Sequence, residues 1–427
     1  MNQNMLAPKI LALALFLCFM IIVSKKCTDD QVNDYLWPPP YNYYLNNTEN
    51  FTVIELDNSS DARCSDGSIY KFYYIPGQGN GSKKFMFFFP GGGYCGDDNT
   101  DMLENCLIRM PTFEGSSSSA GSNGSTFTVG YSLGYFSSDQ HINPLFWNWH
   151  KIYLPYCDGI LFQGYRKDPY VYNGTEIWFR GYNNTLSTFE YVRENYNLFD
   201  AEEVLIAGIS AGGQAIFMWM NYFQKYFPST MKLSGLTDAG LFLDNINQNS
   251  KCHLFRAQMK AIANYTGSIH LDIFYDCKYK DTKFYKCMIP EYIAEFIDVP
   301  MFIINSQNDW QALRGAYGLH CLDHGIQNCP DSVNRKITKF RETFLKVAMK
   351  LKELKPKWGF WLRRCLEHYY GNSIAWIGNL TVFSAESYTD KNIRGAFYEW
   401  YQDAGKAAAY IDLANYQMDC QLINDSQ

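Results

Sequence analysis

The chain contains a glycine-flanked serine between an apolar run and a helix-like pattern. Residues 204–209 read Val-Leu-Ile-Ala-Gly-Ile, Ser210 follows, and Ala-Gly-Gly-Gln then leads into a second apolar stretch. This Gly-x-Ser-x-Gly segment predicts a strand, a sharp turn and a helix. Such a turn lifts the serine Oγ out of the carboxyl edge of a sheet, where a base can take its proton. The alternative is an ordinary glycine-rich connection between a buried strand and a helix.

Strand and helix patterns alternate on both sides of this motif. Residues 68–75 and 84–89 flank a proline- and glycine-rich turn, so we expect them to form a hairpin. Residues 85–89 are apolar on both faces, which is typical of a central strand. The alternation predicts an α/β fold with a mainly parallel sheet and helices on both faces. The other expected strands are 149–153, 204–207 and 301–305, and the expected helices are 184–195, 214–223 and 331–354.

The composition indicates a large globular protein. Of its 427 residues, 47% are hydrophobic and 19% are charged, so a sizeable core is available. The formal net charge of −6 is spread without long runs. This argues against nucleic acid or an anionic membrane surface as the main partner. Zinc binding by the cysteines is the weaker alternative to disulfides, because paired Cys-x-x-Cys knuckles are absent from the sequence. The sequence implies no metal and no organic cofactor. The sequence makes no prediction of the oligomeric state.

The N-terminal segment has the layout of a secretory signal peptide. An apolar run of 14 residues, Ile10–Val23, follows Lys9 and precedes Lys25 and Lys26. The run is short for a membrane span, which needs roughly 20 residues, so we expect no stable span; a signal anchor is the alternative. We expect a signal peptide over 1–26 and a single domain over 27–427.

Cysteines and glycosylation sequons agree with export. Cys18 lies in the apolar run, which leaves 12 of the 13 cysteines for the mature chain, an even number that suggests disulfides. Cys95 and Cys106 are close enough in sequence to form a local bridge. We therefore expect a glycoprotein that is secreted or lies in the lumen of the secretory pathway. The ten Asn-x-Ser/Thr sequons begin at Asn46, Asn50, Asn58, Asn80, Asn123, Asn173, Asn183, Asn264, Asn379 and Asn424.

A second glycine-rich segment directly follows the apolar strand at 84–89. Residues Pro90–Cys95 read Pro-Gly-Gly-Gly-Tyr-Cys. Glycines here expose backbone N–H groups, and the N–H group of Ala211 would join them in binding a developing oxyanion. A phosphate-binding loop is the alternative, but the segment lacks both Gly-x-Gly-x-x-Gly and the Lys-Ser/Thr pair of a P-loop.

An acid and a base are expected after the serine in the chain. Asp309 comes just after the strand pattern at 301–305, at the end where a carboxylate would belong. Of the seven histidines only His320, His324 and His368 lie beyond it. The first two fit a structural or surface role, and their spacing suits a metal on a helix poorly because no Glu lies between them. His368 is the candidate base, on chain order alone.

Several motifs occur along the chain in a fixed order. They are Gly91–Cys95, Tyr156–Gly159, Phe179–Gly181, Gly208–Gly213, Ser234–Phe242, Ile303–Gln311 and Cys365–His368. Together they resemble the pectin acetylesterase and Notum family of secreted α/β-hydrolase-fold carboxylesterases. The resemblance extends from about Cys64 to about Trp400 and is more specific than the serine motif alone.

The resemblance implies a role for six residues. Ser210 is implied as the nucleophile, His368 as the base and Asp309 as the acid that orients it. The implied oxyanion donors are Gly93, Tyr94 and Ala211.

The sequence departs from the family pattern in three places. Tyr94 replaces the usual Trp, which keeps the backbone donor and changes the ring beside the acyl site. Ile209 and Tyr369 stand where plant-type members tend to carry cysteines. The family's Asp-Ser-Trp-Gln aligns with Asn308 in the place of the acid, whereas a gap-free alignment from the preceding strand puts Asp309 there. We favour Asp309, because an Asn cannot stabilise an imidazolium as a carboxylate does.

Three functions follow as hypotheses. The first is removal of O-acetyl groups from a polysaccharide by a serine carboxylesterase, and the second is removal of a fatty acyl group from a secreted protein. The partner is then an acetylated polysaccharide or an acylated protein. The third is a glycan-binding protein that keeps the fold without turnover, and the ambiguity between Asn308 and Asp309 is its main support. We favour the acetylesterase.

Overall fold

The computed structural model describes most of the chain after residue 48. The described residues are 49–96, 101–118, 126–129, 134–274, 276–277, 283–324, 326–370, 376, 381–384, 389–403 and 408–413. The predicted signal peptide at 1–26 lies outside them. Within these ranges, no helix has both the length and the apolar character needed to cross a bilayer.

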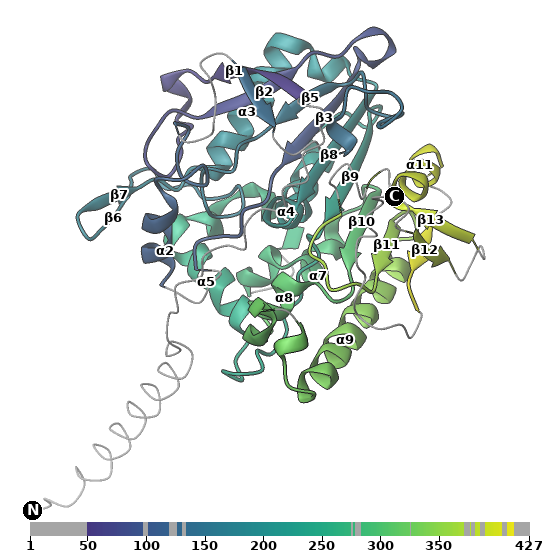
Figure 1. Cartoon of the computed structure of the whole chain (residues 1–427). Helices are drawn as coiled ribbons and strands as arrows, with labels where there is room; N and C mark the ends of the chain where they lie inside the picture. The colour runs from purple at the N-terminus through teal and green to yellow at the C-terminus, as the bar shows by residue number, and fades with distance from the viewer. Residues whose placement is uncertain are drawn as a thin grey trace, which may run out of the picture.

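A ten-stranded sheet in the order β14-β11-β10-β9-β8-β3-β5-β2-β1-β4 forms the centre of the molecule (Figure 1). Neighbouring strands from β14 to β5 are parallel, and β2, β1 and β4 continue the sheet in antiparallel pairing. The mainly parallel sheet is therefore confirmed. The strands are β1 (Glu49–Glu55), β2 (Lys71–Ile75), β3 (Lys84–Phe89), β4 (Thr126–Val129), β5 (His150–Tyr153), β8 (Glu203–Ile209), β9 (Lys232–Asp238), β10 (Met301–Ser306), β11 (Gly359–Arg363) and β14 (Ala409–Ile411). Two small hairpins add β6 (Tyr170–Tyr172) with β7 (Thr175–Ile177), and β12 (Thr381–Ser384) with β13 (Thr389–Asn392).

Side chains of the central strand β3 alternate between two hydrophobic cores. Phe85, Phe87 and Phe89 pack into one core, and Met86 and Phe88 into the other. Each of these five side chains is at most 1% exposed, as expected for a strand that is covered on both faces.

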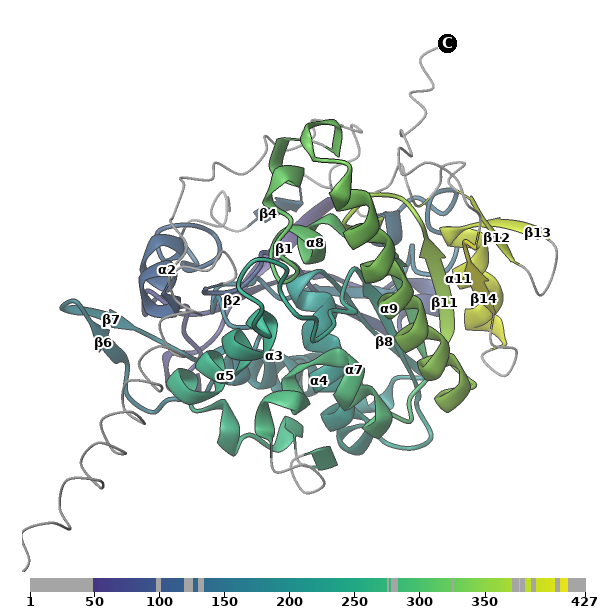
Figure 2. The same cartoon turned by 90° about the horizontal axis from the view of Figure 1, so that it is seen from below.

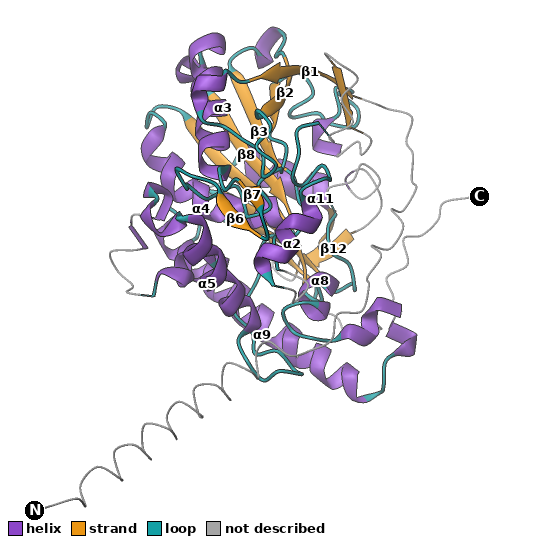
Figure 3. Cartoon of the chain, turned by 90° about the vertical axis from the view of Figure 1, so that its left-hand side faces the viewer, coloured by secondary structure: helices purple, strands orange, loops and turns teal. Residues whose placement is uncertain are grey.

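Helices cover both faces, as predicted. The first core is closed by α3, α4, α5, α7 and α9, and the second by α11 with the segment before β5. Figure 3 shows α3, α4 and α5 along one side of the sheet, and Figure 2 shows α9 and α11 on opposite sides of β11. The helices are α2 (Met102–Arg109), α3 (Gly181–Tyr196), α4 (Ala211–Tyr226), α5 (Leu254–Thr266), α7 (Pro290–Ile293), α8 (Trp310–Arg314), α9 (Ser332–Leu354) and α11 (Ile393–Gln402).

The expected hairpin of residues 68–75 with 84–89 is wrong. Strand β5 lies between β2 and β3, antiparallel to the first and parallel to the second. The connecting segment is held from the β5 side, because the Gln78 N–H group donates to the Asn148 carbonyl at 2.8 Å and Asn148 Nδ2 donates back to the Gln78 carbonyl at 3.0 Å. A strand that is apolar on both faces gains more burial between two parallel neighbours than in a peripheral hairpin.

Disulfides connect segments outside the central sheet, as the even number of cysteines predicted. The predicted local bridge between Cys95 and Cys106 is present. Cys252 and Cys365 are also disulfide-bonded. Further disulfides join Cys64 to Cys157, Cys277 to Cys287 and Cys321 to Cys329.

Candidate active site

Four parallel strands end at the same edge of the sheet and carry the candidate residues there. Strands β3, β8, β9, β10 and β11 lie next to one another in the sheet, in this order. The glycine-rich segment follows β3, Ser210 follows β8, Asp309 lies three residues after β10, and His368 lies five residues after β11. Because parallel strands bring their carboxyl ends to one edge, these distant segments meet.

Ser210 occupies a strained turn between β8 and α4. Its backbone has φ 53° and ψ −120°, which is rare for a residue with a side chain. The Ser210 N–H group donates to the Asp238 carbonyl at 2.8 Å and fixes the turn against β9. The turn also needs glycine, since a Cβ on Gly212 would lie 1.9 Å from the Phe89 carbonyl oxygen.

His368 connects the serine to a carboxylate. The Ser210 hydroxyl lies 2.7 Å from His368 Nε2, and His368 Nδ1 lies 2.8 Å from Asp309 Oδ2. With the proton on Nδ1, the ring donates to Asp309, and Nε2 accepts from Ser210. The His368 and Asp309 side chains are 9% and 3% exposed, whereas Ser210 is half-buried.

Asp309 is the acidic residue that faces the imidazole, and Asn308 points elsewhere. The Asn308 Nδ2 group donates to the Arg364 carbonyl at 2.6 Å. Asp309 begins α8, where its second oxygen, Oδ1, accepts the Ala312 N–H group at 3.0 Å. Both carboxylate oxygens are thus held, and this geometry removes the main support for the non-catalytic hypothesis.

A second buried carboxylate anchors the histidine loop. Asp238 ends β9 with no exposed surface, and its side chain accepts the Tyr370 N–H group at 2.9 Å. Its backbone carbonyl is the acceptor for Ser210. Asp238 therefore links the turn that carries the serine to the loop that carries His368.

The glycine-rich segment lies against the serine. A Cβ on Gly91 would lie 2.8 Å from Ser210 Cβ and 3.5 Å from its Oγ. Ala211 is the first residue of α4, and N–H groups in the first turn of a helix have no partner within the helix. The structure thus brings Gly93, Tyr94 and Ala211 to the same edge as Ser210.

An aromatic wall stands beside the imidazole. The ring of Phe242 lies 6.3 Å from that of His368 and 6.0 Å from that of Phe255, between centroids. Tyr94 lies 6.4 Å from Phe255, and its hydroxyl donates to Gln258 Oε1 at 2.9 Å. The Tyr that replaces the usual Trp is therefore fixed to α5 by a polar contact.

His320 and His324 lie on a 3-10 turn, His320–His324, that is tied to the Cys321–Cys329 bridge. His320 is exposed. The imidazole beside Ser210 is that of His368.

Comparison with known proteins identifies the family. A family model described as Pectinacetylesterase matches residues 45–423. The chain belongs to the pectinacetylesterase family. The predicted family is thereby confirmed, and the predicted class, a carboxylic ester hydrolase, agrees with it.

Two curated relatives and one solved structure illustrate the similarity. Pectin acetylesterase 5 of Arabidopsis thaliana is 32% identical over 265 residues, which cover 61% of this chain and 58% of the relative. The palmitoleoyl-protein carboxylesterase NOTUM of Schmidtea mediterranea is 28% identical over 297 residues, which cover 66% of this chain and 52% of the relative. The matched part thus spans little more than half of these relatives. A structure of the Wnt deacylase Notum from Drosophila superposes on this chain with a TM-score of 0.70 at 17% identity. The superposition covers 86% of this chain and 98% of that chain, and it confirms the predicted α/β-hydrolase-like fold.

Sequence reasoning missed the residues that support the site. Asp238 lay inside a motif of the family resemblance, but nothing in the pattern gave it a structural role. Gln258 carried no signal, because a single polar residue on an amphipathic helix is ordinarily solvated.

The loop after β5 contains a buried carboxyl group, that of Asp158. Burial raises its pKa from the usual 3.8 to about 7, although hydrogen bonds from backbone N–H groups, including those of Ile160 and Gln163, lower it. Between these two pH values the folded protein keeps a proton that the unfolded chain has lost. The free energy of unfolding therefore falls as the pH rises from about 4 to about 7.

We expect Asp158→Asn to remove this pH dependence. Relative to the wild type, the variant gains stability on going from about pH 4 to about pH 8, by up to about 4 kcal/mol, because the amide does not ionise. Denaturant unfolding of both proteins at the two pH values measures the difference, in which other titrating groups cancel. A stability difference that is the same at both pH values would contradict the assignment.

Proposed function

We propose that this chain is a serine carboxylesterase with Ser210, His368 and Asp309 as its catalytic triad. The observation that carries the proposal is the unbroken line of two contacts, 2.7 Å from Ser210 Oγ to His368 Nε2 and 2.8 Å from His368 Nδ1 to Asp309 Oδ2. This is the geometry in which an imidazole takes the proton of a serine hydroxyl.

The first half of the reaction forms an acyl-enzyme. Ser210 Oγ attacks the ester carbonyl carbon while His368 Nε2 takes the hydroxyl proton. The Asp309 carboxylate stabilises the resulting imidazolium and stays ionised. His368 then gives this proton to the leaving alcohol as the ester C–O bond breaks.

In the second half, water attacks the acyl-serine and gives a proton to His368. The Ser210–acyl bond breaks, the acid leaves, and the proton returns to Ser210. In both tetrahedral intermediates the oxyanion accepts hydrogen bonds from backbone N–H groups. We propose the N–H groups of Gly93, Tyr94 and Ala211 as these donors.

We propose acetyl esters of a polysaccharide as the substrate. The family model and the name of the Arabidopsis thaliana relative support this choice. The packing beside His368 supports it too, because Tyr94 and Phe255 are 8% and 1% exposed and the Tyr94 hydroxyl is fixed to Gln258. A filled aromatic wall suits a short acyl group better than a long one.

We further propose that the protein acts in an oxidising compartment, outside the cell or in the secretory lumen. The disulfides support this location, because such bonds persist where thiols are not kept reduced.

Ser210→Ala tests the nucleophile. We expect kcat for nitrophenyl acetate to fall on the order of 10⁴-fold or more, because no covalent intermediate forms. Ser187→Ala is the matched control, since Ser187 lies on α3 and its hydroxyl donates to the Ser60 carbonyl instead of to His368. Hydrolysis by a folded Ser210→Ala protein at the wild-type rate would exclude the mechanism.

Asp309→Asn and Asn308→Ala distinguish the two candidates for the acid. Asp309→Asn is expected to lower kcat about 10⁴-fold, because an amide does not stabilise the imidazolium. Asn308→Ala is expected to cost about 1 kcal/mol of stability, through the lost contact with the Arg364 carbonyl, and to keep kcat near the wild-type value. The reverse ranking of the two kcat values would make Asn308 the functional residue.

A series of nitrophenyl esters from acetate to decanoate tests the acyl group. We expect kcat/KM to be highest for acetate and to fall with chain length. A deep apolar cavity would instead raise kcat/KM about fourfold for each added CH₂ group, since a buried CH₂ contributes about 0.8 kcal/mol. That outcome would favour the alternative, removal of a fatty acyl group from a protein, which the name of the Schmidtea mediterranea relative describes for that enzyme.

A further inference from the structure

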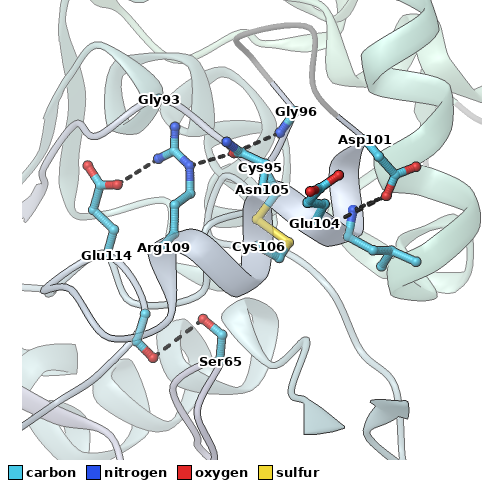
Figure 4. Close-up of a disulfide and its surroundings, with 12 residues drawn as sticks. Ser65, Gly93, Cys95, Gly96, Asp101, Glu104, Asn105, Cys106, Arg109 and Glu114 are labelled. Atoms are coloured by element: carbon cyan, nitrogen blue, oxygen red, sulfur yellow. Dashed lines mark hydrogen bonds and ion pairs between the residues drawn. A yellow bond between two sulfur atoms is a disulfide. The ribbon is translucent and has the colours of Figure 1, made fainter. Parts of the chain in front are cut away.

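The segment that follows the glycines is tied to helix α2. Cys95 forms a disulfide with Cys106 of α2, and Asn105 of the same helix accepts the Gly96 N–H group at 3.0 Å (Figure 4). One helical turn further on, Arg109 ends α2 and reaches back toward the glycines.

Two consecutive carbonyl groups of the glycine segment are held from outside the triad. Arg109 Nη1 donates to the Gly92 carbonyl at 2.5 Å, and the Tyr156 hydroxyl donates to the Gly93 carbonyl at 2.7 Å. In a trans peptide unit the C=O group and the following N–H group point in opposite directions. Holding the Gly92 carbonyl therefore orients the Gly93 N–H group, and holding the Gly93 carbonyl orients the Tyr94 N–H group. These are two of the three donors proposed for the oxyanion.

Arg109 is itself locked in place. Its Nη1 lies 2.7 Å from Glu114 Oε2, and its Nε donates to Asn105 Oδ1 at 2.8 Å. The Arg109 and Glu114 side chains are each 13% exposed. Because the Glu114 carboxylate neutralises the guanidinium, the effect of Arg109 on the site runs through the carbonyl it holds.

Tyr156 is fixed equally firmly. It is 1% exposed, its hydroxyl accepts the Leu161 N–H group at 3.0 Å, and its ring stacks on Phe162 at 4.8 Å between centroids. A Cβ on Gly92 would lie 2.9 Å from both Glu114 Oε1 and Tyr156 Cδ1, so the segment rests directly on these side chains.

We infer that Arg109 and Tyr156 are positioning residues of the oxyanion site. The inference rests on the proposed function. Each side chain prevents one peptide unit from rotating, and a rotated unit would turn a carbonyl oxygen, instead of an N–H group, toward the developing negative charge. Such preorganised donors act in the transition state, so their loss lowers kcat more than it raises KM.

Tyr156→Phe and Arg109→Met test the inference with nitrophenyl acetate. Loss of one oxyanion donor typically lowers kcat about 10²- to 10³-fold. We expect each variant to lower kcat about 10-fold or more with little change in KM, since the donor stays present but is less well oriented. Arg109→Lys keeps a cationic donor and is expected to retain more of kcat than Arg109→Met.

Tyr70→Phe is the matched control. Tyr70 is also 1% exposed, and its hydroxyl donates to the carbonyl of Pro155, the residue before Tyr156. It loses a buried hydrogen bond on the same segment without touching the glycines. We expect its kcat to stay near that of the wild type.

An alkyl boronic acid provides a second readout, because its tetrahedral adduct with Ser210 places an anionic oxygen at the oxyanion site. We expect its inhibition constant to rise in Tyr156→Phe and Arg109→Met by about the factor by which kcat/KM falls, and to stay unchanged in Tyr70→Phe. A fall in kcat without this rise would show that the variants act elsewhere and would overturn the inference.

Two further outcomes would also overturn it. One is an unchanged kcat in folded Tyr156→Phe, which decides the matter alone if Arg109→Met does not fold. The other is an equal loss of kcat in Tyr70→Phe. The proposed function fails separately, if Ser210→Ala retains hydrolysis.

Discussion

The contact between Ser210 and His368 joins residues that are 158 positions apart, and the register of the parallel sheet makes it possible. Strands β8, β9, β10 and β11 are adjacent and parallel, so each turns into its loop at nearly the same level. If the register of one strand slipped by one residue, its loop would move away from the others and its side chains would turn to the opposite core. The apolar packing on both faces of β3 and β8 therefore sets the geometry at the edge as well as the stability of the fold.

Two buried carboxylates fix the position of the His368 imidazole, one by contact with the ring and one by contact with its loop. Asp309 contacts the ring directly, and Asp238 holds the backbone two residues further along the loop. Buried carboxylates are costly unless they accept several hydrogen bonds. Both accept backbone N–H groups, those of Ala312 and Tyr370 respectively. The backbone groups that satisfy the two buried acids thus also help to hold the His368 ring and its loop in place.

The sequence predicted those features that depend on local pattern. The apolar runs predicted β3, β8 and β10, and the glycines around Ser210 predicted the turn. The predicted pairing of β2 with β3 was wrong. The turn between them gives no sign that β5, which comes later in the chain, lies between the two strands in the sheet. The roles of Arg109 and Tyr156 escaped prediction for a related reason. They act on the direction of a peptide group, and peptide orientation leaves no periodic trace in the side chains.

The bridge between Cys95 and Cys106 links the proposed oxyanion site to the redox state of the protein. It closes a loop across a sequence separation of 11 and fastens the helix that carries Arg109 to the residue just after Tyr94. If Arg109 orients the Gly93 N–H group as inferred, reduction of this one bridge would loosen α2 from the glycine segment. The donors of the oxyanion site would then be disturbed while the contacts among Ser210, His368 and Asp309 stay in place.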